Sequence, residues 1–511
     1  MMPSPVTPRP ARAAGVLLHP TSLPGPYGIG DLGPAARAWV DRLASAGQTW
    51  WQVLPLNPPG AGDSPYSAFS AFAGSPLLIS PDDLAADELL RGDDLAAAHL
   101  PPGRVDFARV AVTKGALLAR AWERFRDGAA PRLRAELDAF ASANDWLDDY
   151  ALFTAIKERA PEGVWTDWPT ELVERQPAAL KRTRAELADA VGRHRFVQFV
   201  FSRQLAALRR HAAARGVRLL GDMPIFVAGD SADVWAGPHL FLLDAHRRPK
   251  FVAGVPPDYF SATGQRWGNP LYDWEAMRRD GFAWWAARVR AALAQVDAVR
   301  LDHFRGFEAY WEIPAASPTA QIGRWVEAPG QELLATLRTA LGAAPLPFVA
   351  EDLGVITPPV DALRANFGLP GMRVLQFAFG GAVEERFLPH AFDRNAVVYT
   401  GTHDNDTTRG WYEALTAGER AAFYRYAPEA ARDPVWALIR LGLGSVADTA
   451  VAPLQDVLDL GGEARMNVPG TATGNWRWRV TAEQLAGGHF DRLGELTETY
   501  GRKPDQQSGT D

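Results

Sequence analysis

Charged residues follow an apolar segment near the middle of the chain. The stretch "VRLDHFRG" spans Val299–Gly306 and comes directly after the mainly apolar "AALAQVDA". This pattern predicts a buried β-strand, and the periodicity of a strand places Arg300 and Asp302 on one face. Burying a charge is costly unless it is paired, and a nearby guanidinium lowers the pKa of a carboxyl group. We therefore expect Arg300 to keep Asp302 ionised, either in a structural ion pair or in the floor of an active site.

Two further apolar segments end in acidic residues. Glu351 lies in "PFVAEDLG", and His403 and Asp404 end "AVVYTGTHD". Converging carboxyl groups suit glycoside chemistry, in which one attacks the anomeric carbon and another protonates the leaving oxygen, roughly 5–5.5 Å apart in retaining enzymes. Asp302 has a cation beside it whereas Glu351 follows apolar residues, which favours Asp302 as nucleophile and Glu351 as acid. Asp404 could orient sugar hydroxyls and favour a positively charged transition state.

Other interpretations of these residues stay open from the pattern alone. An isolated Asp at a strand end is commonly a helix N-cap or a turn former. The run "HDND" at 403–406 could bind zinc or manganese. His19 and His303 could be buried structural histidines. The catalytic interpretation is favoured because three predicted strand ends each carry an acid, and the active sites of barrel enzymes lie where the strands end.

Eight apolar segments, most of them separated by helical patterns, predict the elements that hold these residues. Continuous apolar runs are typical of buried parallel strands, so we predict an α/β fold, a (β/α)8 TIM barrel. A doubly wound open sheet is the alternative, although no Gly-rich phosphate-binding turn follows the first strand. The expected strands are Ala13–Pro20, Thr49–Leu56, Val217–Val227, Val296–His303, Pro347–Gly354, Met372–Phe379, Ala396–Asp404 and Ala464–Gly470.

Insertions are expected to interrupt a single catalytic barrel domain that spans residues 1–511. Residues 57–216 begin with a Pro/Gly/Ser-rich loop and continue as helical patterns, which predicts a mainly helical subdomain. Residues 228–277 are irregular and aromatic, and we expect them to form a loop over the cleft. Residues 414–443 predict a further helical insertion. The polar tail "GRKPDQQSGTD" is expected to be disordered.

The composition excludes several classes of protein. The 511 residues contain no Cys, which excludes a disulfide scaffold and a thiol nucleophile and fits a cytoplasmic location. No apolar run reaches 18 residues and the N-terminus lacks the apolar segment of a signal peptide, so no membrane association is expected. The net charge is −7 with both signs interspersed, so no nucleic-acid partner is expected. Some of the 18 Trp residues, such as those in "GQRWGNPLYDW", could be stacking platforms for flat ligands such as sugars.

Several of these segments resemble a known family. "VRLDHFRGF", "VAEDLG" and "YTGTHDNDT" are similar to three signature segments of the α-amylase superfamily. In "LLGDMPIFVAGDSADVW", Asp222 lacks the His that usually follows it by about five residues, and this departure fits the amylomaltase branch, glycoside hydrolase family 77. "HPTSLPGPYGIGDLG", "WWQVLPLNPPG", "DSPYSAFSAFAG", "PPDYFSATGQRWGNPLYDW" and "RMNVPGTATGNWRWR" resemble the same branch. The matches occur in order from about Gly15 to Arg479.

The resemblance implies roles for the matched residues. Asp302 would be the nucleophile, Glu351 the general acid/base and Asp404 the stabiliser of the transition state. Five other residues would contact the sugar beside the cleaved bond: Tyr66, Asp222, Arg300, His303 and His403. Four residues would cover the cleft and shape its acceptor side: Tyr259, Phe260, Gln265 and Trp267. Many members carry a Tyr where this chain has Ala61, which leaves open whether an accessory glucan-binding groove exists.

The implied activity is that of a 4-α-glucanotransferase, which moves segments of α-1,4-glucan to another α-glucan or glucose. The reaction would be a retaining double displacement through a covalent glycosyl-enzyme, with no cofactor, no metal and no C-terminal β-sandwich. Maltodextrins, starch and glucose would be the partners, and a monomer or weak oligomer is expected. The rival hypotheses are a plain α-glucan hydrolase, a non-catalytic sugar-binding barrel and a metal-dependent barrel hydrolase.

Overall fold

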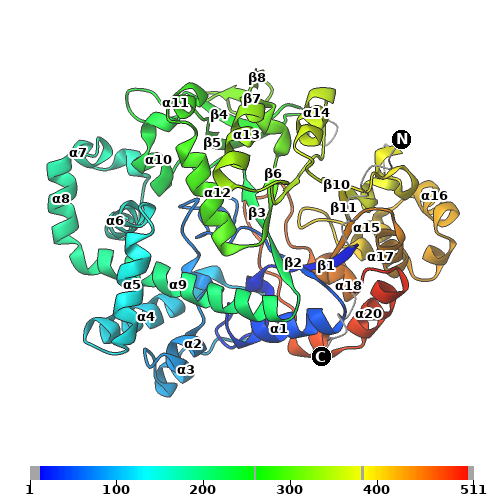
Figure 1. Cartoon of the computed structure of the whole chain (residues 1–511), viewed down its shortest axis with the longest axis horizontal. Helices are drawn as coiled ribbons and strands as arrows, with labels where there is room; N and C mark the ends of the chain where they lie inside the picture. Colours follow the sequence, from blue (N-terminus) through cyan, green and yellow to red (C-terminus); the bar gives the residue numbers. More distant parts are fainter. Residues whose placement is uncertain (1–11, 258–260, 381–384, 505–511) are drawn as a thin grey trace, which may run out of the picture.

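Eight parallel strands form the centre of the computed structural model, which describes residues 12–257, 261–380 and 385–504 (Figure 1). The strands pair in the order β10-β11-β12-β1-β2-β3-β6-β9, so β1 pairs with both β2 and β12 and the sheet curves back on itself. The strands are β1 (Ala13–Leu17), β2 (Trp50–Gln52), β3 (Arg218–Pro224), β6 (Ala298–Asp302), β9 (Phe348–Ala350), β10 (Gly371–Val374), β11 (Ala396–Tyr399) and β12 (Thr449–Pro453).

The sheet closes into a barrel between β9 and β10, where individual hydrogen bonds replace a regular ladder. The backbone N–H of Ala350 donates to the carbonyl of Pro370 at 2.9 Å. The backbone N–H of Met372 donates to the Asp352 carboxylate at 2.6 Å. The predicted (β/α)8 barrel is therefore confirmed, and the carboxyl ends of its strands meet at one mouth.

The eighth strand was predicted in the wrong place. It is β12, whereas residues 464–470 lie outside the strands of the described chain. The small residues of "TAVAP" give β12 a weak apolar signal, although four of its five residues are buried. The backbone of the 464–470 segment instead bonds to neighbouring loops: Asn467 N–H donates to His403 O at 3.2 Å, and Met466 O accepts from Trp476 N–H at 2.8 Å.

Helices occupy most of residues 57–216, and one of them belongs to the barrel itself. Helix α9 (Ala188–Ala214) packs on α1 (Pro34–Ser45) and on β3, as the helix that precedes a barrel strand does. The shorter helices extend away from the strands to one side (Figure 1). They are α2 (Pro81–Ala86), α3 (Gly92–Ala97), α4 (Phe107–Arg126), α5 (Arg132–Ser142), α6 (Trp146–Arg159), α7 (Thr170–Val173) and α8 (Pro177–Glu186).

A second sheet forms where irregular structure was expected. Strands β4 (Phe251–Val255) and β5 (Gln265–Pro270) pair in an antiparallel sheet with β7 (Ala309–Pro314) and β8 (Arg324–Glu327), in the order β5-β4-β7-β8. The sequence "QRWGNP" of β5 has little strand propensity, so pairing with distant segments decides its structure. Helices α10 (Ala232–Ala236) and α11 (Trp274–Arg279) flank this part of the chain.

The remaining helices begin with α12, which packs on β3 and β6, and continue around the rest of the barrel and beyond it. No C-terminal β-sandwich is present, because after β12 the described residues form only helices, turns and loops. Within the described ranges, no helix is both long and apolar enough to span a bilayer. The remaining α-helices are α12 (Ala283–Gln295), α13 (Gly330–Leu341), α14 (Pro358–Asn366), α15 (Thr408–Ala414), α16 (Ala417–Tyr426), α17 (Pro434–Gly444), α18 (Leu454–Val457), α19 (Ala482–Ala486) and α20 (His489–Thr499).

Candidate active site

Arg300 lies at the centre of the charged residues in the barrel mouth. It is the register partner of Asp222 on the neighbouring strand, so their side chains share a face. Its Nη1 lies 2.9 and 2.7 Å from the two Asp222 oxygens, and its Nη2 lies 2.9 Å from Asp302 Oδ1. Burial would lower the pKa of Arg300, but the Asp222 and Asp302 charges outweigh burial and raise it well above its usual value. The predicted pairing of Arg300 with Asp302 is therefore present.

Tyr66 joins this charged cluster to the loop after β11. Its hydroxyl donates to Asp222 Oδ2 at 2.8 Å, and its ring stacks on the His403 ring with centroids 5.1 Å apart. Burial raises the pKa of Tyr66 well above the ordinary value for a phenol, so the hydroxyl stays protonated as a donor. The ring of Trp476 lies 5.8 Å from Tyr66 and 6.0 Å from His403.

Glu351 directly follows β9 and is buried. Its carboxylate accepts hydrogen bonds from the backbone N–H groups of His303 at 2.7 Å and Leu353 at 2.8 Å. Burial nevertheless raises the pKa of Glu351 to about 7; Arg300 opposes the rise and Asp302 adds to it. A carboxyl group with that pKa can both donate and accept a proton near neutral pH, as a general acid/base must.

His303 contacts both Glu351 and the antiparallel sheet. Its backbone is left-handed, with φ at 53°, which is uncommon for a residue with a side chain and is often found at functional sites. Trp267 meets the His303 ring edge-on, with centroids 4.8 Å apart. Burial lowers the pKa of His303 to about 4, so the ring is neutral at physiological pH.

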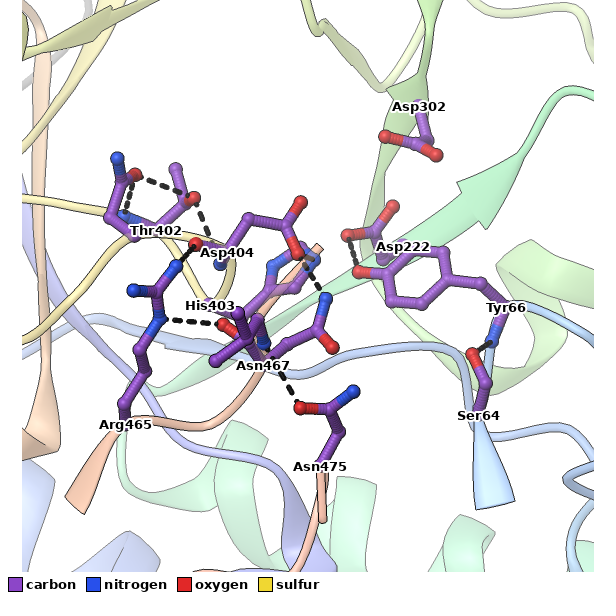
Figure 2. Close-up of polar contacts among 12 residues, drawn as sticks. Ser64, Tyr66, Asp222, Asp302, Thr402, His403, Asp404, Arg465, Asn467 and Asn475 are labelled. Atoms are coloured by element: carbon purple, nitrogen blue, oxygen red, sulfur yellow. Dashed lines mark hydrogen bonds and ion pairs between the residues drawn. The ribbon is translucent and has the colours of Figure 1, made fainter. Parts of the chain in front are cut away.

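Asp404 lies in the loop after β11, and its side chain is 46% exposed. Its Oδ1 is 3.3 Å from His403 Nε2 and accepts a hydrogen bond from Asn467 Nδ2 at 2.6 Å. Figure 2 shows the carboxylates of Asp222, Asp302 and Asp404 facing one another across the mouth of the barrel. Three carboxylates from three strand ends therefore converge, and Glu351 lies beside Asp302 through its bond to His303.

The structure brings together most of the residues that the sequence singled out. Arg300, Asp302, Glu351, His303 and His403 form one cluster with Tyr66, Asp222 and Asp404. Trp267 borders this cluster, and its Nε1–H donates to Gln265 Oε1 at 3.2 Å. Tyr259 and Phe260 lie outside the described residues. No roles were predicted for Arg465, Asn467 and Trp476, although all three lie in "RMNVPGTATGNWRWR", which is similar to the family.

His19 and the "HDND" run were open to other interpretations in the sequence. His19 lines a pocket with His403, Asn405 and Asp406, and burial lowers the pKa of His19 to about 3. In the "HDND" run, Asn405 Oδ1 accepts from Thr402 N–H at 2.9 Å. Among the residues that the structure describes, no group of three or more His, Cys, Asp or Glu side chains has an arrangement that could hold a metal ion.

Comparison with known proteins gives the same assignment along nearly the whole chain. A family model described as 4-alpha-glucanotransferase matches residues 18–484. The 4-alpha-glucanotransferase of Thermus thermophilus is 51% identical over 500 residues, covering 96% of this chain and 99% of that protein. The Synechocystis enzyme of the same name is 48% identical over 499 residues, covering 96% and 98%. The solved structure of amylomaltase from Streptococcus agalactiae in complex with acarbose matches with a TM-score of 0.93 at 38% identity, covering 96% of this chain and 100% of that one.

Proposed function

We propose a reaction for this chain, which belongs to the 4-alpha-glucanotransferases of glycoside hydrolase family 77. It transfers segments of α-1,4-glucan to another α-glucan or to glucose. The observation that carries this proposal is the pair formed by Asp302 and Glu351. Asp302 is paired with a buried Arg300, whereas burial raises the pKa of Glu351 to about 7. One carboxyl group is thereby suited to attack and the other to proton transfer.

In the first step, Asp302 forms a bond to the anomeric carbon while the glycosidic bond breaks. Protonated Glu351 gives its proton to the leaving oxygen, so that the departing glucan leaves as a neutral alcohol. The developing positive charge on the sugar ring lies among Asp222, Asp302 and Asp404, and Asp404 stabilises it. For this retaining geometry we expect the Asp302 and Glu351 carboxyl groups to lie roughly 5–5.5 Å apart.

In the second step, the 4-hydroxyl of an acceptor sugar attacks the same carbon and breaks the ester to Asp302. Glu351, now a carboxylate, takes the proton of that hydroxyl and is ready for the next cycle. Two inversions give net retention of the α configuration. Tyr66, Asp222, Arg300, His303 and His403 hold the donor sugar in this scheme.

Transfer must outcompete attack by water, so the acceptor needs a binding surface of its own. Trp267 is 39% exposed and borders His303, which supports a role in binding the acceptor sugar. Gln265, Tyr259 and Phe260 belong to the same proposed acceptor side. The proposed cellular location is the cytoplasm, where α-glucans and reducing conditions coexist.

The products formed from maltotriose test this function. A transferase gives glucose together with a ladder of longer maltodextrins, and the total number of reducing ends stays constant. A steady rise in reducing ends without longer products would identify a hydrolase instead. Added glucose should trap the glycosyl-enzyme and shorten the ladder.

A further inference from the structure

The segment after helix α18 lies against the loop that carries Asp404. Arg465 Nη2 donates to the carbonyl of Asp404 at 2.7 Å, and Asn467 N–H donates to the carbonyl of His403 at 3.2 Å. The side chain of Asn467 donates from Nδ2 to Asp404 Oδ1 at 2.6 Å. Figure 2 shows Arg465 beside the backbone of Asp404 and the Asn467 amide at its carboxylate.

Asp404 needs such support because its own loop constrains it weakly. It lies five residues beyond β11, which ends at Tyr399, and its side chain is 46% exposed. Thr402 Oγ1 accepts from the Asp404 backbone N–H at 3.2 Å, a contact that fixes the main chain and leaves the carboxylate free to rotate. Of the two side-chain contacts to Oδ1, that of Asn467 is 0.7 Å shorter than that of His403, 2.6 against 3.3 Å.

We propose that Asn467 is a positioning residue for Asp404, an inference that rests on the transition-state role proposed above for that acid. Its amide holds Oδ1, so that Oδ2 turns toward the sugar. An amide donor is neutral, so it orients the carboxylate without a cation that would offset its negative charge. Asp302, which forms a covalent bond, is by contrast paired with Arg300.

Asn467 is itself held in place from both sides. Arg465 Nε donates to the carbonyl of Asn467 at 2.8 Å and thereby links it to the backbone of Asp404. The next residue, Val468, donates its N–H to Asn475 Oδ1 at 3.0 Å. The amide thus comes from an ordered backbone, which a positioning residue requires.

Two substitutions separate positioning from folding. Asn467→Ala removes the donor, and we expect kcat on maltotriose to fall about 10- to 100-fold, as for loss of a hydrogen bond to a charged group, with KM within about threefold. Asn467→Asp keeps the shape of the side chain but places a second carboxyl group at hydrogen-bond distance from Asp404. One of the two then retains its proton, because two like charges repel. A protonated Asp at 467 can donate in place of the amide. The activity of this variant relative to wild type should therefore be highest at about pH 5 and fall toward that of Asn467→Ala as the pH rises to 7.

Matched variants give each outcome a meaning. Asn475→Ala loosens the segment that holds Asn467 but keeps the amide donor, so we expect a smaller loss than in Asn467→Ala and a wild-type pH profile. Near-wild-type kcat in Asn467→Ala, a flat pH ratio for Asn467→Asp, or an equal loss in Asn475→Ala would each overturn the inference.

Asp404→Asn separates the two proposals. If it is active, the role of Asp404 is wrong; if it is inactive while Asn467→Ala is active, only the positioning role is wrong. Thermal melting of every variant checks folding.

Discussion

At the scale of single residues, Arg300 sets the charges of the site because it contacts two carboxylates at once. The ion pairs with Asp222 and Asp302 offset the free-energy cost of burying the Arg300 guanidinium. Two carboxylates against one guanidinium leave this group of three with a net negative charge. That net charge suits a reaction whose transition state is positive, whereas the raised pKa of Glu351 comes mainly from its burial. Burial of Glu351 therefore supports acid catalysis, and the net negative charge around Arg300 supports stabilisation of the cation.

Glu351→Gln should remove acid/base catalysis and leave the nucleophile intact. We expect activity on maltotriose to fall about 10²- to 10⁴-fold, the usual contribution of a positioned proton donor. A donor such as α-maltosyl fluoride needs no proton to expel its leaving group, so a burst of fluoride should survive in the variant. The wild-type kcat/KM for maltotriose should fall above about pH 7, where Glu351 loses its proton. Loss of the fluoride burst would indicate a wider structural defect. Glu327→Gln makes the same substitution at an exposed position and serves as the control, which should keep wild-type activity.

At the scale of elements, strand ends were predictable where local sequence determines them. Strand periodicity alone places Arg300 and Asp302 on one face of β6, and the predicted ion pair between them is present. The eighth strand was missed because small residues in "TAVAP" give no strong apolar signal. The antiparallel sheet was missed because β5 acquires its conformation by pairing with β4, which in turn pairs with β7 far along the chain. The role of Asn467 could not be predicted, since its partner is 63 residues away.

The seam between β9 and β10 predicts a strong effect for Asp352. Its buried carboxylate accepts from Met372 N–H at 2.6 Å and lies 3.2 Å from Arg373 and 3.5 Å from Arg364. Asp352→Asn removes the buried counter-charge of these cations, and we expect a loss of about 3–5 kcal/mol in the free energy of unfolding. Chemical denaturation measures this loss.

Asp361→Asn is the matched control for Asp352→Asn, because both acids lie near Arg364. Asp361 lies 3.9 Å from the same Arg364, but its side chain is 56% exposed. Asp361→Asn should therefore cost only about 0–1 kcal/mol, as surface pairs do. Equal losses in the two variants would show that the seam does not depend on Asp352. Activity of Asp352→Asn should fall as well, because Glu351 is the preceding residue.

The antiparallel sheet offers a test of acceptor binding on its two edge strands. Trp267 on β5 and Trp325 on β8 are each 39% exposed, but Trp267 contacts His303 whereas Trp325 packs on Arg305 and Trp311. Trp267→Ala should weaken transfer more than cleavage, so the ratio of hydrolysis to transfer on maltotriose should rise severalfold. Trp325→Ala should leave that ratio unchanged. The same ratio in both variants would place acceptor binding elsewhere.

At the scale of the whole molecule, the barrel explains how residues far apart in sequence form one site. Tyr66, Asp222, Asp302, Glu351 and Asp404 come from five segments spread over more than 300 residues. Closure of the sheet brings their strand ends to one mouth, so the fold itself assembles the cluster. Its buried acids cost stability, because burial disfavours their charged forms.

That cost predicts how stability depends on pH. Burial raises the pKa of Glu351 from its ordinary value of 4.5 to about 7, so between these values the folded protein binds more protons than the unfolded chain. The contribution of Glu351 to the free energy of unfolding is therefore fully present below about pH 4.5 and is lost as the pH rises through 7. The total change is about 3 kcal/mol. Glu351→Gln cannot titrate, so its denaturation midpoint minus that of wild type should increase from pH 5 to pH 7.5 and then level off. Taking the difference removes the contributions of other groups, such as the buried His19 and His303. A difference that stays constant across this range would mean that Glu351 titrates near its ordinary pKa, and the acid/base role proposed for it would lose its electrostatic basis.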